Sequence, residues 1–300
     1  MWDAIRKTAL GLIALACLAG QAAARCEDYV PQPKPQNASR DIIGQDLDQI
    51  VARGWVDIAL FEEFPPYSYA ENGKPTGIDV EIGALIAQAL GVEPKFRLVG
   101  AGENLDADLR NWIWKGPVTG GRVANIMMHI PYDSTFACRA EQVVFTGQYA
   151  TESIAIAYAQ SAYPDGEAPV PAYFRFDPVG VENDSISDFY LTAFPGGQLS
   201  KKMARYPTTA DAMAGLAAGE VKAVMGPRTQ LEAGLTDGLK VHQPPLPGFA
   251  VGQWTLGTAV NFRYRALGYA VDDAIFAAIE DGRIADIYAK YGATWQAPER

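Results

Sequence analysis

The sequence predicts an α/β protein built as two lobes joined by a hinge of two chain segments. A strand–loop–helix unit at Val56–Leu90 begins one series of elements, and a second series begins at Val179. Two apolar strands, Ser153–Ala159 and Thr258–Phe262, lead out of the first series and back into it. Alternating strands and helices favour a mostly parallel sheet covered by helices. The expected boundaries are lobe one at 41–151 and 257–300, and lobe two at 152–256.

The Val56–Leu90 unit organises the first lobe. Val56, Ile58 and Leu60 alternate along the chain, which predicts a strand with one buried face. Prolines at 65 and 66 end this strand, and apolar residues at 82, 85, 86, 89 and 90 then follow the spacing of one helix face. Ligands of open α/β sheets bind beyond the carboxyl ends of the strands, so Tyr67 is a candidate for the wall of a cleft.

The N-terminus has the pattern of a secretory signal peptide. Arg6 and Lys7 precede a short apolar run, and the small residues at 22–24 predict cleavage near Ala24. Removing residues 1–24 takes away two basic residues and one acidic residue, so the net charge changes from −10 to −11. We expect a periplasmic protein without a membrane anchor, and an acidic chain without a basic cluster argues against nucleic-acid partners. The prolines of residues 25–40 predict an extended segment.

Cysteine usage is consistent with export. Cys17 leaves with the signal peptide, and Cys26 and Cys138 remain. In an oxidising compartment this pair predicts a disulfide that ties the new N-terminus to the first lobe, and two unrelated thiols are the alternative.

The remaining elements follow from periodicity and from glycine and proline stops. In chain order they are a helix at 41–53, a strand at 95–99, a helix ending near 114, strands at 123–130 and 143–145, a proline-rich loop at 164–173, a strand at 179–181, a helix reaching 191, a helix at 208–218, strands at 221–225 and 258–262, and helices at 267–281 and 283–291.

Several candidate cleft residues lie near ends of these elements. Of Trp112 and Trp114, one is expected in the core and the other at the surface, and packing of both is the alternative. Alternation places at least one of Met127 and Met128 in the core, and both are kept as candidates for the cleft wall. His129 is either a hydrogen-bonded structural histidine or a ligand-binding one.

The order of these features resembles the periplasmic solute-binding proteins of polar amino-acid uptake systems, solute-binding protein family 3, over most of Gly54–Gly292. The resemblance implies a type II periplasmic binding protein. In that family an arginine clamps the ligand carboxylate, and Arg139 matches it, although bracing the cleft through Glu62 or Glu63 is the alternative. Tyr149 matches the hinge tyrosine, and Thr151 and Gly257 lie at the two expected crossings.

Other positions depart from the amino-acid-binding pattern. Phe136 replaces the threonine that partners the arginine, and Pro227, next to Arg228, replaces the aspartate that grips an ammonium group. The second-lobe turn contains Asp184 and Ser185, and an aspartate there repels a carboxylate. The sequence therefore predicts a cleft that has lost polar donors and gained apolar surface.

A narrower resemblance fits these departures. The run Gly91–Arg139 resembles the binding-protein-like J proteins encoded beside quinoprotein methanol dehydrogenases, the lanthanide-associated XoxJ type more than the calcium-associated MxaJ type. The resemblance implies an accessory factor that helps a PQQ-dependent dehydrogenase to mature. The expected partners are that enzyme and, as a further candidate, its cytochrome c. We expect a monomer, and the alternatives are a receptor for a small organic solute and, less favoured, a periplasmic lyase.

Catalysis has no visible apparatus. The chain contains only two histidines, His129 and His242, and no G-x-S-x-G, H-E-x-x-H or C-x-x-C motif. An Asp-x-Asp-x-Asp-Gly calcium loop is also absent, so we expect neither a metal nor another cofactor on this chain.

Overall fold

The computed structural model describes residues 44–117, 120–163, 166–249 and 252–299. The predicted signal peptide (1–24) and extended segment (25–40) lie outside these residues. Nine strands form one continuous sheet in the order β4-β1-β5-β11-β6-β9-β7-β8, and β10 pairs with β6. Their bounds are β1 Trp55–Phe61, β4 Glu93–Val99, β5 Ile126–Tyr132, β6 Val143–Ala159, β7 Val179–Glu182, β8 Met203–Tyr206, β9 Ala223–Pro227, β10 Leu239–His242 and β11 Gln253–Asn261. A separate hairpin contains β2 Tyr69–Glu71 and β3 Lys74–Thr76.

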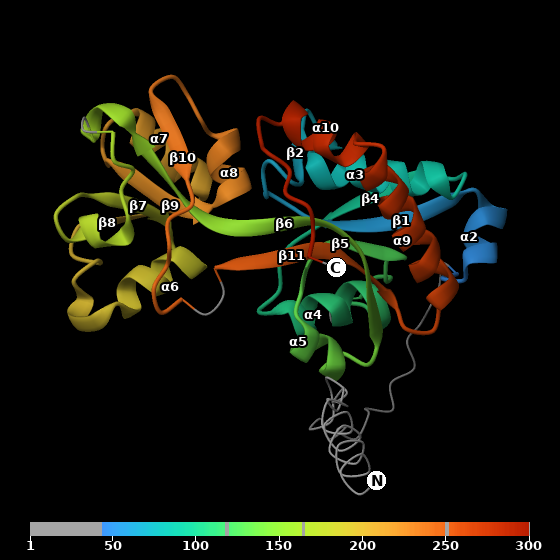
Figure 1. Ribbon diagram of the computed structural model, residues 1–300. Helices are drawn as coiled ribbons and strands as arrows, with labels where there is room; N and C mark the ends of the chain where they lie inside the picture. The colour runs from blue at the N-terminus through green and yellow to red at the C-terminus, as the bar shows by residue number, and fades with distance from the viewer. Residues whose placement is uncertain (1–43, 118–119, 164–165, 250–251, 300) are drawn as a thin grey trace, which may run out of the picture.

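Helices cover both faces of the sheet in the first lobe (Figure 1). One face packs against α3 (Ile78–Ala89), α9 (Arg265–Glu280) and α10 (Arg283–Lys290). The other face packs against α4 (Leu105–Leu109) and the π-helical turn Arg110–Trp114 that continues it, with α5 (Ser134–Arg139) nearby. A short helix, α2 (Leu47–Arg53), precedes β1. Because both faces are covered, β1 is buried along nearly its whole length.

The second lobe has its own two apolar clusters. One cluster includes residues of α6 (Ile186–Ala193) and the 3-10 turn Pro171–Arg175. The other includes residues of α7 (Thr209–Ala217) and α8 (Arg228–Ala233). Further 3-10 turns lie at Gln160–Ala162 and Pro195–Gly197. Separate cores on the two sides give the two-lobed shape of Figure 1.

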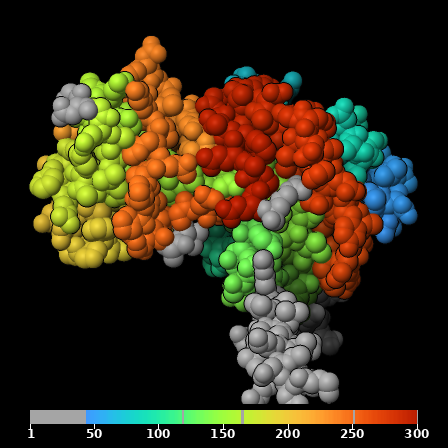
Figure 2. All heavy atoms as spheres, in the orientation of Figure 1, coloured from blue at the N-terminus to red at the C-terminus, as the bar shows by residue number. Residues whose placement is uncertain are grey.

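Two long antiparallel strands connect the lobes. β6 contributes to the sheet of both lobes, pairing with β11 through its first part and with β9 and β10 through its last part. A C-terminal segment, residues 293–299, lies across these strands: Thr151 donates hydrogen bonds to the backbone oxygens of Gln296 (2.9 Å) and Ala297 (2.7 Å). Figure 2 shows the red C-terminal part of the chain against the orange second lobe, where the Thr294 N–H donates to Glu232.

Several predicted elements differ from the structure. The helix expected from Asp41 begins at Leu47, because Asp46 accepts a hydrogen bond from the backbone of Asp48 and caps it there. Two short helices, α5 and α8, have no counterpart among the predicted elements. The expected strands at 143–145 and 153–159 are parts of one strand, β6.

Candidate ligand pocket between the lobes

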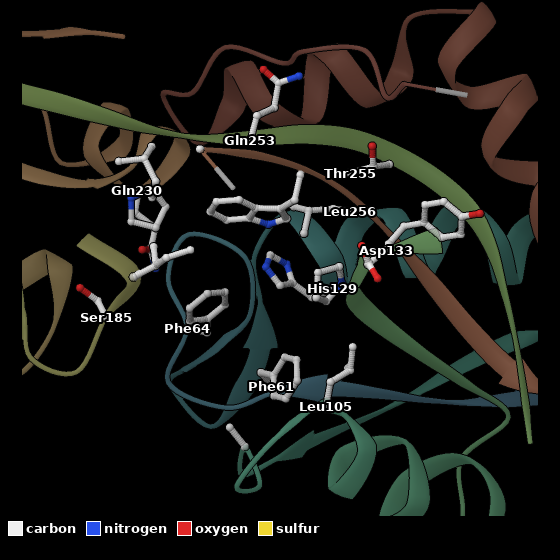
Figure 3. Close-up of a pocket in the computed structure, with 18 of the residues that line it drawn as sticks. Phe61, Phe64, Leu105, His129, Asp133, Ser185, Gln230, Gln253, Thr255 and Leu256 are labelled. Atoms are coloured by element: carbon white, nitrogen blue, oxygen red, sulfur yellow. The ribbon is translucent and has the colours of Figure 1, made fainter. Parts of the chain in front are cut away.

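A pocket of about 1560 Å³ lies between the lobes on one side of the connecting strands. The first lobe contributes the carboxyl end of β1, the loop before α4, and β5 with the residues after it. The second lobe contributes the N-terminus of α6 and the residues before β11. Figure 3 shows side chains from both lobes around this space, among them His129 and Phe64 from the first lobe and Ser185 and Gln230 from the second. The pocket therefore lies beyond strand ends, where open α/β sheets bind ligands.

The lining is aromatic and acidic. Its aromatic side chains are Phe61, Phe64, Tyr132, Phe249 and Trp254. Its carboxylates are Glu62, Asp108, Asp133, Glu182 and Glu299, and its glutamines are Gln148, Gln230, Gln243 and Gln253. No lysine or arginine is among the described residues that line the pocket. The local charge is therefore negative and favours cationic groups over anionic ones.

His129 enters the pocket from an irregular position in β5. Its φ of 60° lies in the left-handed region, and the register of β5 against β11 shifts at this point. Its Nδ1 lies 3.0 Å from Oδ2 of the buried Asp79, whose Oδ1 accepts the Tyr149 hydroxyl at 2.7 Å. The imidazole packs edge-to-face on Tyr67 and Phe64, with ring centroids 4.2 and 4.9 Å away. Such strain persists only where its surroundings hold it, which identifies this position as a candidate functional one.

Buried tyrosines support the floor below His129. The Tyr67 hydroxyl donates to the carboxylate of Glu152, which is 1% exposed. Burial, and then the neighbouring carboxylate, raises the pKa of Tyr67 well above its ordinary value, and the same causes act on Tyr149 beside Asp79. Both hydroxyls therefore stay protonated and donate to these carboxylates.

Two carboxylates lie against one glycine turn at the pocket wall. Asp108 is 5% exposed, and its Oδ1 accepts the Gly102 N–H at 2.6 Å. Glu62 Oε1 lies 3.1 Å from the point where a Cβ on Gly100 would stand. Burial raises the pKa of the Asp108 carboxyl, and the Gly102 hydrogen bond opposes this. The absence of side chains at Gly100 and Gly102 lets both acids approach the turn.

Of the expected cleft residues, Glu62, His129 and Ser185 line the pocket. The others do not, which corrects the prediction for each. Met127 and Met128 are fully buried on opposite faces of the sheet, because helices cover both faces. Tyr67 lies in the core beneath Phe64 rather than at the pocket wall.

The charged candidates also lie elsewhere. Asp133 caps α5, so the segment after it forms a helix that carries the exposed Arg139 away from the lining. Ser185, not Asp184, caps α6, and the exposed Asp184 precedes the cap in a left-handed conformation. Arg228 is 3% exposed and pairs with Glu232 within α8. Trp112 and Trp114 are both half-buried, and they pack against the apolar cluster on the α4 side of the first-lobe sheet.

The expected hinge residues lie on the two connecting strands. Tyr149 and Thr151 are on β6 and Gly257 is on β11, and their action as a hinge stays a prediction. Cys138 is disulfide-bonded. Cys26 lies outside the described residues, so the pairing of these two cysteines also stays a prediction.

The sequence did not identify most of the lining. Phe61 and Phe64 carried a usable signal, because they flank the end of a predicted strand. Asp108 lies in a predicted helix, and nothing in the sequence marked which face of that helix borders the pocket. Gln243 and Trp254 lie far along the chain and reach the pocket only through the second lobe.

Comparison with known proteins supports the architecture. Residues 56–111 match the model of the bacterial extracellular solute-binding proteins, family 3. An ancestral cationic amino acid solute-binding protein superposes with a TM-score of 0.67 at 20% identity, over 82% of this chain and 99% of its own. The chain has the type II periplasmic-binding-protein fold. No curated protein matches the sequence significantly.

Two further structures share this fold. An amino acid ABC transporter substrate-binding protein from Streptococcus pneumoniae, bound to L-arginine, superposes with a TM-score of 0.58 at 17% identity, over 84% of this chain and 99% of its own. A histidine kinase sensor domain superposes with a TM-score of 0.53 at 21% identity, over 80% of this chain and 97% of its own. Among the described residues, no helix is long and apolar enough to cross a membrane.

Proposed function

We propose that this chain is an exported, non-catalytic binding protein that holds a segment of a partner protein in the pocket between its lobes. The observation that carries the proposal is the lining, which combines five carboxylates with aromatic side chains and, among the described residues, no lysine or arginine. Capture of a free amino acid requires donors for its carboxylate, most effectively an arginine. Arg139, the expected donor, is exposed on α5 outside the lining.

The size of the pocket also favours a large ligand. Small-molecule pockets have volumes of roughly 300–1,000 Å³. The volume here, about 1560 Å³, exceeds that range and accommodates several residues of an extended chain. Aromatic side chains beside hydrogen-bonding glutamines suit a peptide, which presents both apolar side chains and backbone polar groups.

The sequence resemblance supplies the candidate partner, a PQQ-dependent methanol dehydrogenase. The resembling run, Gly91–Arg139, forms much of the first-lobe wall through Asn104, Leu105, Asp108 and His129. Several residues of the run that carries this resemblance therefore line the pocket, which supports the proposal. We propose that binding there assists maturation or activation of the dehydrogenase, and that the lanthanide-dependent enzyme is the partner.

A receptor for a small organic solute is the second candidate. An ancestral cationic amino acid solute-binding protein and an ABC transporter substrate-binding protein bound to L-arginine share this fold at 20% and 17% identity. The same fold also occurs in a histidine kinase sensor domain, so it is not confined to uptake. If the chain is such a receptor, the two lobes must close around the small cation and so reduce the pocket volume from the present value of about 1560 Å³.

A pull-down with purified apo and mature methanol dehydrogenase tests the proposal. Ala101 is exposed and lines the pocket, so Ala101→Trp adds bulk there without disturbing the core. We expect the wild type to retain the dehydrogenase and A101W to lose it. Ala289→Trp, at an exposed position on α10 outside the lining, is the matched control and should bind as the wild type does. The small-solute receptor would be favoured if the wild type retained neither the apo nor the mature dehydrogenase and calorimetry showed micromolar binding of an amino acid.

A further inference from the structure

The pocket contains a pair of carboxylates that the protein leaves without a positive partner. Asp108 Oδ2 accepts no hydrogen bond from the described residues, and neither carboxylate oxygen of Glu62 does. Neither acid forms an ion pair within the described part of the chain. Asp108 is 5% exposed and has one hydrogen bond and no counter-ion, so a cation that reached its Oδ2 from the pocket would pair with a largely desolvated carboxylate.

The other lining acids are already engaged. Asp133 accepts the Phe136 N–H at 2.6 Å, and Glu182 accepts the backbone N–H and hydroxyl of Thr209 at 2.9 and 2.7 Å. Glu299 accepts from the Gln253 side chain at 3.0 Å. Each of these three acids therefore already accepts at least one hydrogen bond from within the protein. Glu62 differs from these three acids because it accepts no hydrogen bond from the described residues. Asp108, which accepts the Gly102 N–H, differs because it is the buried carboxylate of the described lining.

The surroundings of the pair suit a large, weakly hydrated cation. Both acids lie against the turn Gly100–Gly102, and the Ala101 side of this turn faces the pocket. Phe61 and Phe64, at the end of β1, line the same wall with ring centroids 6.5 Å apart. Aromatic faces attract cations, and a guanidinium can bridge two carboxylates with its planar set of donors.

We propose that Glu62 and Asp108 form the recognition point for a basic side chain, an arginine or lysine, carried by the protein segment that occupies the pocket. The inference rests on the proposed function, since it names the chemical character of the bound segment. It predicts specificity for an internal basic residue rather than for a free amino acid, because the described part of the lining offers no arginine or lysine to a free α-carboxylate.

Calorimetry with capped pentapeptides tests the proposal. The probes are acetylated, amidated alanine peptides whose central residue is Arg, Gln or Glu, together with free L-arginine. We expect only the Arg peptide to bind measurably. For that peptide, Asp108→Asn should weaken binding about tenfold and Glu62→Gln about threefold, because the first carboxylate is the more deeply desolvated. Glu280→Gln, an exposed acid on α9 outside the pocket, should change nothing.

Other outcomes would overturn the proposal. Equal binding of the Gln or Glu peptide, or of the Arg peptide to D108N and E62Q, would show that the pair does not select charge. Tighter binding of free L-arginine than of the capped peptide would assign the site to a free solute. If D108N and E62Q still retain the dehydrogenase at wild-type strength while A101W loses it, the proposed function stands and this inference fails. If the wild type retains no dehydrogenase, the proposed function fails first.

Discussion

Tyr67 and Glu152 form a buried hydrogen bond between the loop after β1 and the strand that links the lobes. Removing the hydroxyl in Tyr67→Phe leaves a Glu152 oxygen without its donor. We expect the free energy of unfolding to fall by about 2 kcal/mol, as for other buried polar groups that lose a partner. Urea denaturation measures this. Tyr269→Phe, at a side chain that is 68% exposed, should have almost no effect, and equal losses in the two variants would contradict the assignment.

Asp108 should make stability depend on pH in a defined direction. Its folded-state pKa is raised above the ordinary 3.8, so its contribution to stability is complete below 3.8 and is lost as pH rises through the folded value. Asp108→Asn removes this loss, and the variant should gain stability relative to the wild type as pH rises from acid to neutral. Urea denaturation across this range measures the difference, and a difference independent of pH would contradict the expectation.

Asp188→Asn is the control, because its stability relative to the wild type should change with pH in the opposite direction. The hydrogen bond from Arg205 lowers the pKa of Asp188, so its stabilisation is present above 3.8 and is lost as pH falls through the folded value. Relative to the wild type, this variant should lose stability as pH rises to neutral.

For single residues, the sequence predicted where a side chain lies along its helix or strand better than it predicted whether that side chain is buried. Glu62, His129 and Ser185 line the pocket because each lies at or near the end of an element facing the cleft. Met127 and Met128 were misplaced because alternation does not reveal that both faces of a sheet are covered. The strained φ of His129 has no sequence signal, since it depends on the register shift between β5 and β11.

Among the elements, the junction between the Tyr67 loop and α3 depends on Gly77. Its φ is 129°, and a Cβ there would lie 2.2 Å from the Tyr67 carbonyl oxygen. The same carbonyl accepts the Asp79 N–H at 2.9 Å and so satisfies a donor in the first turn of α3. Gly77→Ala should destabilise the protein by roughly 3 kcal/mol or more, through strain and loss of this contact. Gly73→Ala also has a positive φ but nothing within 4 Å of the added Cβ, and should cost clearly less in thermal denaturation.

The C-terminal segment should restrain the connecting strands. Besides its bonds to Thr151, it places the Trp295 indole N–H 2.8 Å from the Tyr149 carbonyl oxygen. Deleting residues 294–300 removes these bonds, so we expect faster hydrogen exchange at the Thr151 amide and a lower Tm. Glu299→Ala removes only an exposed contact to Gln253 and should leave both quantities unchanged. Unchanged exchange in the deletion variant would show that the segment does not restrain β6.

Long periodic elements were predictable, and short ones were not. Periodicity placed α3, α7, α9 and α10. The six-residue helices α5 and α8 are too short to show a period, and they depend on contacts beyond their own sequence. Both omissions affected the site, because α5 removes Arg139 from the pocket and α8 buries Arg228.

For the whole molecule, the two-lobed fold followed from the order of strands and helices, because that order restricts the topologies available. The chemical character of the pocket did not follow from it. Its lining comes from segments spread between Phe61 and Glu299, and only the packing of the two lobes brings their carboxylates together. The expectation of a more apolar cleft relied on Met127 and Met128, which are buried, and it did not anticipate the acidic lining.

The most direct test of the account is the salt dependence of dehydrogenase binding to the wild type and to D108N, measured together with an amino-acid panel. An acidic pocket that holds a basic segment predicts binding near physiological salt, about 150 mM, that weakens as salt rises, and a shallower dependence for D108N. It also predicts no micromolar affinity for any free amino acid. Micromolar binding of one amino acid, with no dehydrogenase bound at any salt concentration, would contradict the account.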